Sequence, residues 1–131
     1  MISRRPILIS LAGLIAFAAS PAAARSDLPK GLDTDNDATI DLADAKKAAG
    51  TLFDKLDHEH DGTLDAKELH RRLDKGEISA ADLDKDGTLT KDEYLAVVES
   101  RFKAADTDND GTLTAKELHS KAGRALLKLL K

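Results

Sequence analysis

The sequence predicts an all-α fold, a compact bundle in which helices alternate with four acidic loops of 12 residues. Two observations carry this prediction. An acidic residue stands at positions 1, 3, 5 and 12, and an aliphatic residue at position 8, in segments that begin at residues 33, 57, 82 and 106. Between these segments, apolar residues recur at steps of three and four, the spacing of one face of an α-helix. The near-constant repeat of 24 or 25 residues indicates one repeated structural unit rather than isolated acidic turns.

The first 24 residues have the pattern of a secretory signal peptide. Arg4 and Arg5 precede an apolar run over 7–19, and three alanines at 22–24 form a small-residue cleavage site. The alternative is a membrane anchor, but a spanning helix needs about 20 apolar residues and this run has 13. We therefore expect one mature domain at 25–131, periplasmic or secreted, with no stable membrane insertion after cleavage.

The acidic residues are concentrated in the loops. Of the 24 Asp and Glu residues, 19 lie inside the four segments, and removal of the first 24 residues changes the net charge from −4 to −6. Nucleic-acid binding requires a basic surface, so this balance argues against it and favours cations. The chain has no cysteine, hence no disulfide, and no Ser/His/Asp cluster; we expect no enzymatic activity.

The first elements follow from local patterns. The segment 26–32 contains Pro29 and Gly31 and is too short for a helix that enters loop 1 (33–44). The segment 42–56 is predicted to be a helix that leads to loop 2 (57–68). Gly50 inside it costs about 1 kcal/mol relative to Ala and could allow a bend.

The second half contains three predicted helical regions. After loop 2, 66–73 is predicted to be helical with Leu69 and Leu73 on one face, 74–76 is a stop, and Ser79 is the expected N-cap of a short helix before loop 3 (82–93). The segment 91–105 reads as one helix with an apolar stripe of Leu95, Val98 and Phe102. After loop 4 (106–117), one helix is expected from 115 to about 130.

The lengths of these helices predict how the loops pair. A gap of 12 residues between loops rises only about 18 Å as a helix, so it holds a single helix. Loops 1 and 2 share one such helix and lie at its opposite ends, and loops 3 and 4 share another. The broken segment between loops 2 and 3 allows the chain to reverse. We therefore expect loop 2 to pair with loop 3 through Leu64 and Leu89, and loop 1 with loop 4 through Ile40 and Leu113.

Each loop offers oxygen ligands in the order of an EF-hand Ca²⁺ loop: carboxylates at positions 1, 3 and 5, a turn at 6, a backbone carbonyl at 7, a water-mediated contact at 9 and a carboxylate at 12. The candidate ligands are Asp33, Asp35, Asp37, Thr39, Asp41 and Asp44 in loop 1; Asp57, Glu59, Asp61, Thr63, Asp65 and Glu68 in loop 2; Asp82, Asp84, Asp86, Thr88, Thr90 and Glu93 in loop 3; and Asp106, Asp108, Asp110, Thr112, Thr114 and Glu117 in loop 4.

Loop 1 is the degenerate copy. Ala38 replaces the glycine of a left-handed turn, at a cost of roughly 1–2 kcal/mol, and Asp44 is shorter than the usual glutamate. We expect weak binding there, or a structural role through Ile40. The histidines, His58, His60, His70 and His119, are expected to be solvated surface residues, as are most lysines and arginines.

The chain resembles the lanmodulin-like family, small periplasmic bacterial proteins with four EF-hands. The resemblance rests on the loop spacing behind a signal peptide and on the segments 52–57, 61–69 and 121–126. It implies lanthanide-selective binding, a metal-driven disorder-to-order transition and the loop pairing given above. The family's loops typically have Pro at position 2 and Asp at position 9. Here position 2 holds Thr34, His58, Leu83 and Thr107, and position 9 is Asp only in loops 1 and 2. The resemblance therefore supports metal binding more strongly than it supports a preference for lanthanides.

These observations predict a protein that folds when a cation neutralises its loops. The first hypothesis is an exported Ca²⁺ buffer or carrier, and the second is a protein for trivalent lanthanides, which are also hard and oxygen-seeking. Loop 2, with five carboxylates, is the loop best supplied for a higher charge. A Ca²⁺ sensor with an unknown protein partner ranks third, because sensors favour a Met-rich groove and Met1 is the sole methionine.

Overall fold

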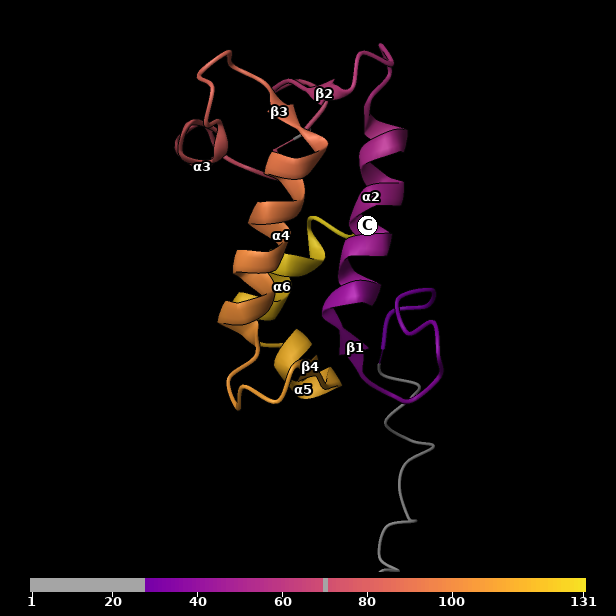
Figure 1. The fold of residues 1–131 in the computed structure, drawn as a ribbon. Coiled ribbons are helices and arrows are strands. Elements are labelled where there is room, and N and C mark those ends of the chain that lie inside the picture. Colours follow the sequence, from indigo (N-terminus) through magenta and orange to yellow (C-terminus); the bar gives the residue numbers. More distant parts are fainter. Residues whose placement is uncertain (1–27, 70) are drawn as a thin grey trace, which may run out of the picture.

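A computed structural model describes residues 28–69 and 71–131. The predicted signal peptide and His70 lie outside the described residues. Two long helices, α2 (Leu42–Leu56) and α4 (Lys91–Ala105), lie side by side, and a small two-stranded sheet stands at each end of the pair (Figure 1). None of the described helices is long and apolar enough to cross a membrane. The all-α prediction is confirmed.

Both long helices have the bounds that the periodicity predicts. Asp41 caps the start of α2, since its side chain accepts a hydrogen bond from the Asp44 N–H at 2.7 Å. Thr90 caps α4 in the same way. The helix α2 runs through Gly50 without interruption. The missing side chain leaves room there for Lys91, whose Cε would lie 3.3 Å from an added Cβ.

The strands join the loops in the predicted pairs. β1 (Ile40–Asp41) pairs antiparallel with β4 (Thr112–Leu113), and β2 (Thr63–Leu64) with β3 (Leu89–Thr90). Ile40 lies opposite Leu113 and Leu64 opposite Leu89, and all four side chains are fully buried. Each end of the bundle therefore carries two acidic loops held together by a two-residue ladder.

The helix predicted over 66–73 is wrong. Residues 66–69 form turns, with a hydrogen bond from the Leu69 N–H to the Asp65 carbonyl at 3.0 Å. Arg71 has a φ of 66°, which an α-helix does not contain. The physical reason is the pairing of β2 with β3, because the chain must reverse over these few residues. Leu69 and Leu73 are nevertheless buried.

The short helix before loop 3 begins earlier than predicted. α3 (Lys75–Ala81) starts after Asp74, which is its N-cap, and Ser79 lies inside the helix. Asp74 and Glu77 form a capping box, in which each side chain accepts a hydrogen bond from the other's N–H at 2.8 Å. The segment 74–76, predicted to stop a helix, therefore starts one.

The single helix predicted after loop 4 is also wrong, since two helices are present. α5 (Ala115–Leu118) ends at His119, and α6 (Lys121–Leu127) begins after Ser120, whose hydroxyl accepts a hydrogen bond from the Gly123 N–H at 3.0 Å. Gly123 packs directly on the backbone of α5: an added Cβ would lie 2.2 Å from the Glu117 carbonyl oxygen. This close approach turns the chain back against α4.

The core joins these elements through apolar contacts and a few buried polar ones. Tyr94 is fully buried between the helices, and its hydroxyl donates to the Leu129 carbonyl at 2.8 Å. Arg101 of α4 donates to the Ala125 carbonyl at 2.6 Å and pairs with Glu77 of α3. The C-terminal segment and α3 are thus both tied to α4.

Burial raises the pKa of Tyr94 to about 12, which predicts a loss of stability at alkaline pH. The folded state resists ionisation of the phenol, whereas the unfolded chain ionises near pH 10. The contribution is therefore complete below about pH 10 and is lost as the pH rises towards 12. Denaturant unfolding of the metal-loaded protein from pH 8 to 12 measures it, and absorbance at 295 nm follows the only tyrosine of the chain.

Tyr94→Phe provides the comparison. At pH 8 the variant should be less stable by about 1–3 kcal/mol, because the buried Leu129 carbonyl loses its donor. The difference in stability should shrink above pH 10, since only the wild type loses stability as its phenol ionises. A constant difference up to pH 12 would contradict this assignment.

Candidate metal centres

The four loops share one backbone path. In each, the residues at positions 4 and 6 have a positive φ, the left-handed region that favours glycine. The φ values at position 4 are 61° (Asn36), 56° (His60), 58° (Lys85) and 55° (Asn109), and those at position 6 are 70° (Ala38), 82° (Gly62), 85° (Gly87) and 85° (Gly111). Each of the four loops therefore curls in the same way around its own central space.

The aspartate at position 1 is held by the turn that follows it. In loop 3, the Gly87 N–H donates to Asp82 Oδ2 at 2.7 Å, and in loop 4 the Gly111 N–H donates to Asp106 Oδ2 at 3.0 Å. Asp57 in loop 2 and Asp33 in loop 1 accept the equivalent bonds. These bonds hold one carboxylate oxygen and orient the group across the loop.

The aspartate at position 5 is held by the threonine at position 7. Thr63 donates both its N–H and its hydroxyl to Asp61 Oδ1, each at 2.9 Å. These bonds, the backbone bond first, lower the pKa of Asp61. The hydroxyl and N–H of Thr39 lower the pKa of Asp37 in the same way. In loops 1 and 2, the position-5 carboxylates are therefore held in the ionised form and are already oriented.

The glutamate at position 12 closes loops 2, 3 and 4. In loop 3, Glu93 accepts hydrogen bonds from the Leu83 N–H at 2.6 Å and the Thr90 N–H at 2.9 Å. Glu117 and Glu68 make the corresponding bonds across loops 4 and 2. All three glutamates are buried. Each therefore brings a carboxylate from the last position of its loop back to the N–H at position 2.

Carboxylate oxygens gather in three of the loops. Among residues 28–69 and 71–131, groups with ligand atoms within 4.8 Å of one another are Asp33, Asp35 and Asp37; Asp82, Asp84 and Glu93; and Asp106, Asp108 and Glu117. Loops 3 and 4 thus combine acids from both ends of the loop. In loop 2, the longer Glu59 replaces aspartate at position 3, and the described residues there form no such group.

The crowding of these acids changes their proton affinity. A hydrogen bond with Asp82 raises the pKa of Asp84. Burial, followed by a hydrogen bond with Asp106, raises the pKa of Asp108. Carboxylates this close do not all ionise without a compensating charge. An arrangement made only of oxygen donors suits a hard cation such as Ca²⁺.

The residues at position 9 have a role that the sequence analysis missed. Asp41, Thr90 and Thr114 each accept a hydrogen bond from the N–H of the position-12 residue and so cap the following helix. Asp65 makes the same bond to the Glu68 N–H at 2.8 Å. The signal is present in the sequence, because Thr-x-x-Glu is a capping box. Position 9 thus orients the position-12 ligand.

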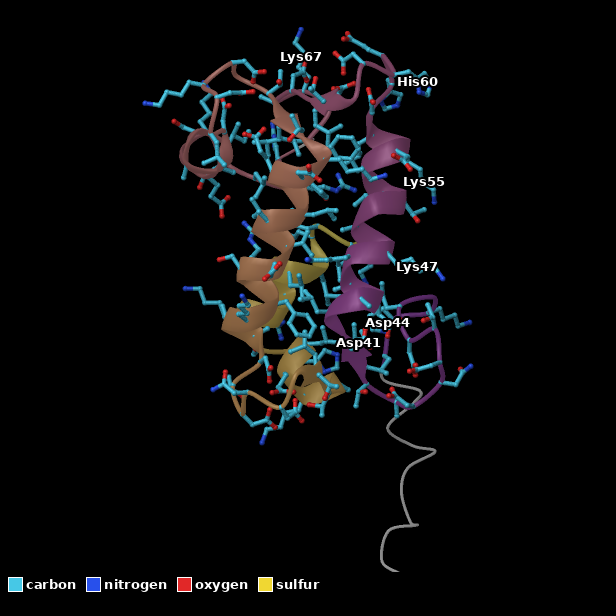
Figure 2. The ribbon with its side chains drawn as sticks, in the orientation of Figure 1. Asp41, Asp44, Lys47, Lys55, His60 and Lys67 are labelled. Atoms are coloured by element: carbon cyan, nitrogen blue, oxygen red, sulfur yellow. The ribbon has the colours of Figure 1, made fainter. Side chains whose placement is uncertain are left out.

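Loop 1 has the same left-handed turn as the other loops, but its position-12 residue, Asp44, does not join the acids at the start of the loop. Asp44 is buried and accepts a hydrogen bond from the Thr34 hydroxyl, and it is absent from the acid group formed by the other aspartates of the loop. Ala38 adopts the left-handed conformation at a φ of 70° despite its Cβ. Weak binding in loop 1 remains a prediction, and Figure 2 shows Asp44 at the end of α2 that adjoins the loop.

The double variant Ala38→Gly/Asp44→Glu is expected to convert loop 1 into a tight site. Glycine removes roughly 1–2 kcal/mol of left-handed strain, and glutamate supplies the reach that loops 3 and 4 show. Calorimetric Ca²⁺ titration should then find one more tight site than in the wild type. Ala38→Gly alone should strengthen loop 1 only modestly. An unchanged stoichiometry in the double variant would show that something other than these two residues limits the loop.

The histidines take no part in the acid groups. His58, His60 and His119 are exposed, and none belongs to a group that could hold a metal within the described ranges. The ring nitrogen Nδ1 of His58 lies 2.8 Å from the Leu56 carbonyl oxygen. The site chemistry is therefore that of oxygen ligands.

Comparison with known families agrees with this geometry. A family model described as "EF hand" matches three consecutive segments, residues 50–74, 75–98 and 98–120. Together these segments span more than half of the chain and contain loops 2, 3 and 4, whereas loop 1 lies outside them. No curated protein matches the chain.

Proposed function

Because the chain belongs to the EF-hand family, we propose that it is an exported calcium-binding protein that folds on binding its ions and acts as a metal buffer or carrier. The candidate ligands are the residues of the four loops given above. Loops 2, 3 and 4 are the tight sites in this proposal, and loop 1 is weak.

One observation carries the proposal. Every buried charged residue in the described part of the chain stands at position 1 or 12 of a loop, with exposed fractions of 6–9%: Asp44, Asp57, Glu68, Asp82, Glu93, Asp106 and Glu117. The ion pairs of the described residues join other groups: Lys46 and Lys103 to Glu99, Lys91 to Asp54, and Arg101 to Glu77. Buried carboxylates are costly unless a cation compensates their charge, and within residues 28–69 and 71–131 no lysine or arginine forms an ion pair with these acids. A bound metal ion supplies that charge.

This requirement links binding to folding. Without an ion, clustered carboxylates repel one another, and the chain has no disulfide to oppose that repulsion. With the ion, the free energy of binding becomes free energy of folding. The protein should therefore be loose without metal and helical with it.

Far-ultraviolet circular dichroism tests the proposal. Protein in excess chelator should lose most of its helical signal and regain it as Ca²⁺ is added, with an end point at a whole number of ions per chain. Mg²⁺ at the same concentration is the control, since it binds such loops less readily. Identical spectra with and without chelator, together with no Ca²⁺ uptake, would contradict the proposal.

The second candidate is a lanthanide-binding function. It is favoured by the oxygen-only donor set of the acid groups and by the five carboxylates of loop 2. Competition between La³⁺ and Ca²⁺ separates the two candidates. An advantage of La³⁺ beyond that expected from its extra charge would favour the lanthanide function. Comparable occupancy at equal free concentrations would favour calcium.

Export is tested separately. Cell fractionation and mass spectrometry of the mature chain should find the protein outside the cytoplasm with Arg25 near its amino terminus. Retention of residues 1–24 on a membrane-bound form would instead support the anchor alternative.

A further inference from the structure

A second candidate site lies outside the space enclosed by the metal loops. A groove of about 430 Å³ is formed by three segments: residues 30–34, the face of α2 away from α4, and the chain end at Leu130 and Lys131. Thr34 and Asp44 of loop 1 border it, but the acids that face the loop interior do not line it. The groove therefore adjoins loop 1 through Thr34 and Asp44 but does not include its acid group of Asp33, Asp35 and Asp37.

Lysines surround this groove. Lys30, Lys47 and Lys55 line it together with Lys131. Lys47 and Lys55 are eight residues apart on α2, about two helical turns, and Figure 2 shows both projecting from the side of the helix opposite α4. No ion pair joins these lysines to a carboxylate in the described ranges, whereas Lys46, Lys91 and Lys103 are paired. The acidic residue in the lining, Asp44, is buried and already accepts a hydrogen bond from Thr34.

The floor of the groove is apolar. Leu32 and Leu130 are almost fully buried beneath it, and Ala48 and Leu52 of α2 are partly exposed to it. The segment 129–131 is held in place, because Tyr94 donates to the Leu129 carbonyl and Arg72 donates to the main-chain oxygen of Lys131 at 3.3 Å. The groove thus combines a preformed leucine floor with a lysine rim.

We propose that this groove binds a small amphipathic anion, a molecule with an apolar body and one carboxylate, sulfonate or phosphate head. The apolar body covers the leucines and the head contacts the ammonium groups of Lys47 and Lys55. The volume of the groove lies within the range of small-molecule sites, which is about 300–1,000 Å³. The charge complementarity is local, since the chain as a whole is acidic, with a net charge of −4.

Titration of the full-length, Ca²⁺-saturated protein with octanesulfonate tests this proposal, because a sulfonate does not sequester the Ca²⁺ of the loops. Calorimetry should show saturable binding that weakens with added salt. Octanol, the uncharged analogue, should bind much more weakly. In NMR spectra, the methyl signals of Leu32, Leu52 and Leu130 should shift, while those of the exposed Leu83 beside α3 should not.

Matched charge variants locate the head group. Lys47→Gln/Lys55→Gln should weaken octanesulfonate binding about fivefold or more. Lys67→Gln/Lys75→Gln removes the same charge from exposed positions outside the groove and should leave the affinity unchanged. Circular dichroism checks that both variants fold with Ca²⁺.

Four results would overturn the proposal: no saturable binding, equal binding of octanol, equal loss of affinity in both double variants, or methyl shifts centred on Leu83. Association with anionic vesicles in the absence of any binding to monomeric octanesulfonate would also overturn it, because the ligand would then be a membrane surface.

Discussion

Replacement of Gly123 by alanine is expected to destabilise the protein by about 3 kcal/mol or somewhat more. An added Cβ would lie 2.2 Å from the Glu117 carbonyl oxygen, 2.5 Å from Leu118 Cα and 2.6 Å from the Leu118 carbonyl carbon. All three are main-chain atoms, so no side-chain rotation relieves the clash. Overpacking of this kind typically costs 1–3 kcal/mol and occasionally more, and here α5 and α6 must move apart (Figure 1).

The consequence reaches loop 4. Glu117 is both the residue against which Gly123 packs and the position-12 ligand candidate, whose carboxylate accepts hydrogen bonds from the N–H groups of Thr107 and Thr114. Displacement of α5 should therefore weaken Ca²⁺ binding in loop 4 while loops 2 and 3 keep theirs. Denaturant unfolding in saturating Ca²⁺ and calorimetric titration measure the two effects.

Gly50→Ala is the matched control. It is the same change inside a helix, but the added Cβ would meet only the flexible end of the Lys91 side chain, at 3.3 Å. Alanine is about 1 kcal/mol more favourable than glycine in a helix interior, so this variant should be neutral or slightly more stable. Similar losses in both variants would show that the close approach at Gly123 has no special effect.

Glu93→Gln is expected to weaken Ca²⁺ binding in loop 3 about a hundredfold or more. Glu93 is buried, faces the acids Asp82 and Asp84, and closes the loop. Removal of one member of a buried charge pair costs about 2–5 kcal/mol, and each 1.4 kcal/mol is a factor of ten. Glutamine also serves at this position of a capping box, so the start of α4 is preserved and the loss reports the ligand charge.

Calorimetric titration should find one tight Ca²⁺ site fewer in Glu93→Gln than in the wild type. The control is Asp44→Asn in loop 1, where the number of tight sites should not change, because Asp44 lies outside the acid group of its loop. If both variants lost one tight site, loop 1 would be a full site and the degenerate-copy prediction would be wrong.

Local patterns predicted much of this fold correctly. The helices over 42–56 and 91–105 have the predicted bounds because their apolar spacing is regular and an acidic loop ends each one. The pairing of Ile40 with Leu113 and of Leu64 with Leu89 followed from two features of the sequence. One helix cannot place both of its loops at the same end, and the broken segment between loops 2 and 3 allows the chain to reverse. The candidate ligands could likewise be located from the repeat.

The errors fall where contacts between distant or adjoining elements override periodicity. Leu69 and Leu73 have helical spacing, yet the described residues between β2 and α3 form turns and bends, because the chain reverses to pair β2 with β3. Leu118, Leu126 and Leu129 also have helical spacing, but Ser120 breaks the helix and Gly123 allows α6 to fold back on α5. Asp74 and Glu77 form a capping box that is visible in the sequence, but the segment 74–76 was predicted to end a helix and not to begin one.

The sequence by itself determined where the four loops lie, which acids face each loop, and which loops share a helix, because these properties depend on neighbours within a few residues. Only the tertiary structure decided that seven of the eight acids at positions 1 and 12, all but Asp33, are buried with no ion pair to a basic side chain among the described residues. It also decided that lysines from α2 and the residues before loop 1 meet leucines in one groove. Burial and juxtaposition arise when segments far apart in the chain pack together, and no short-range pattern contains that information.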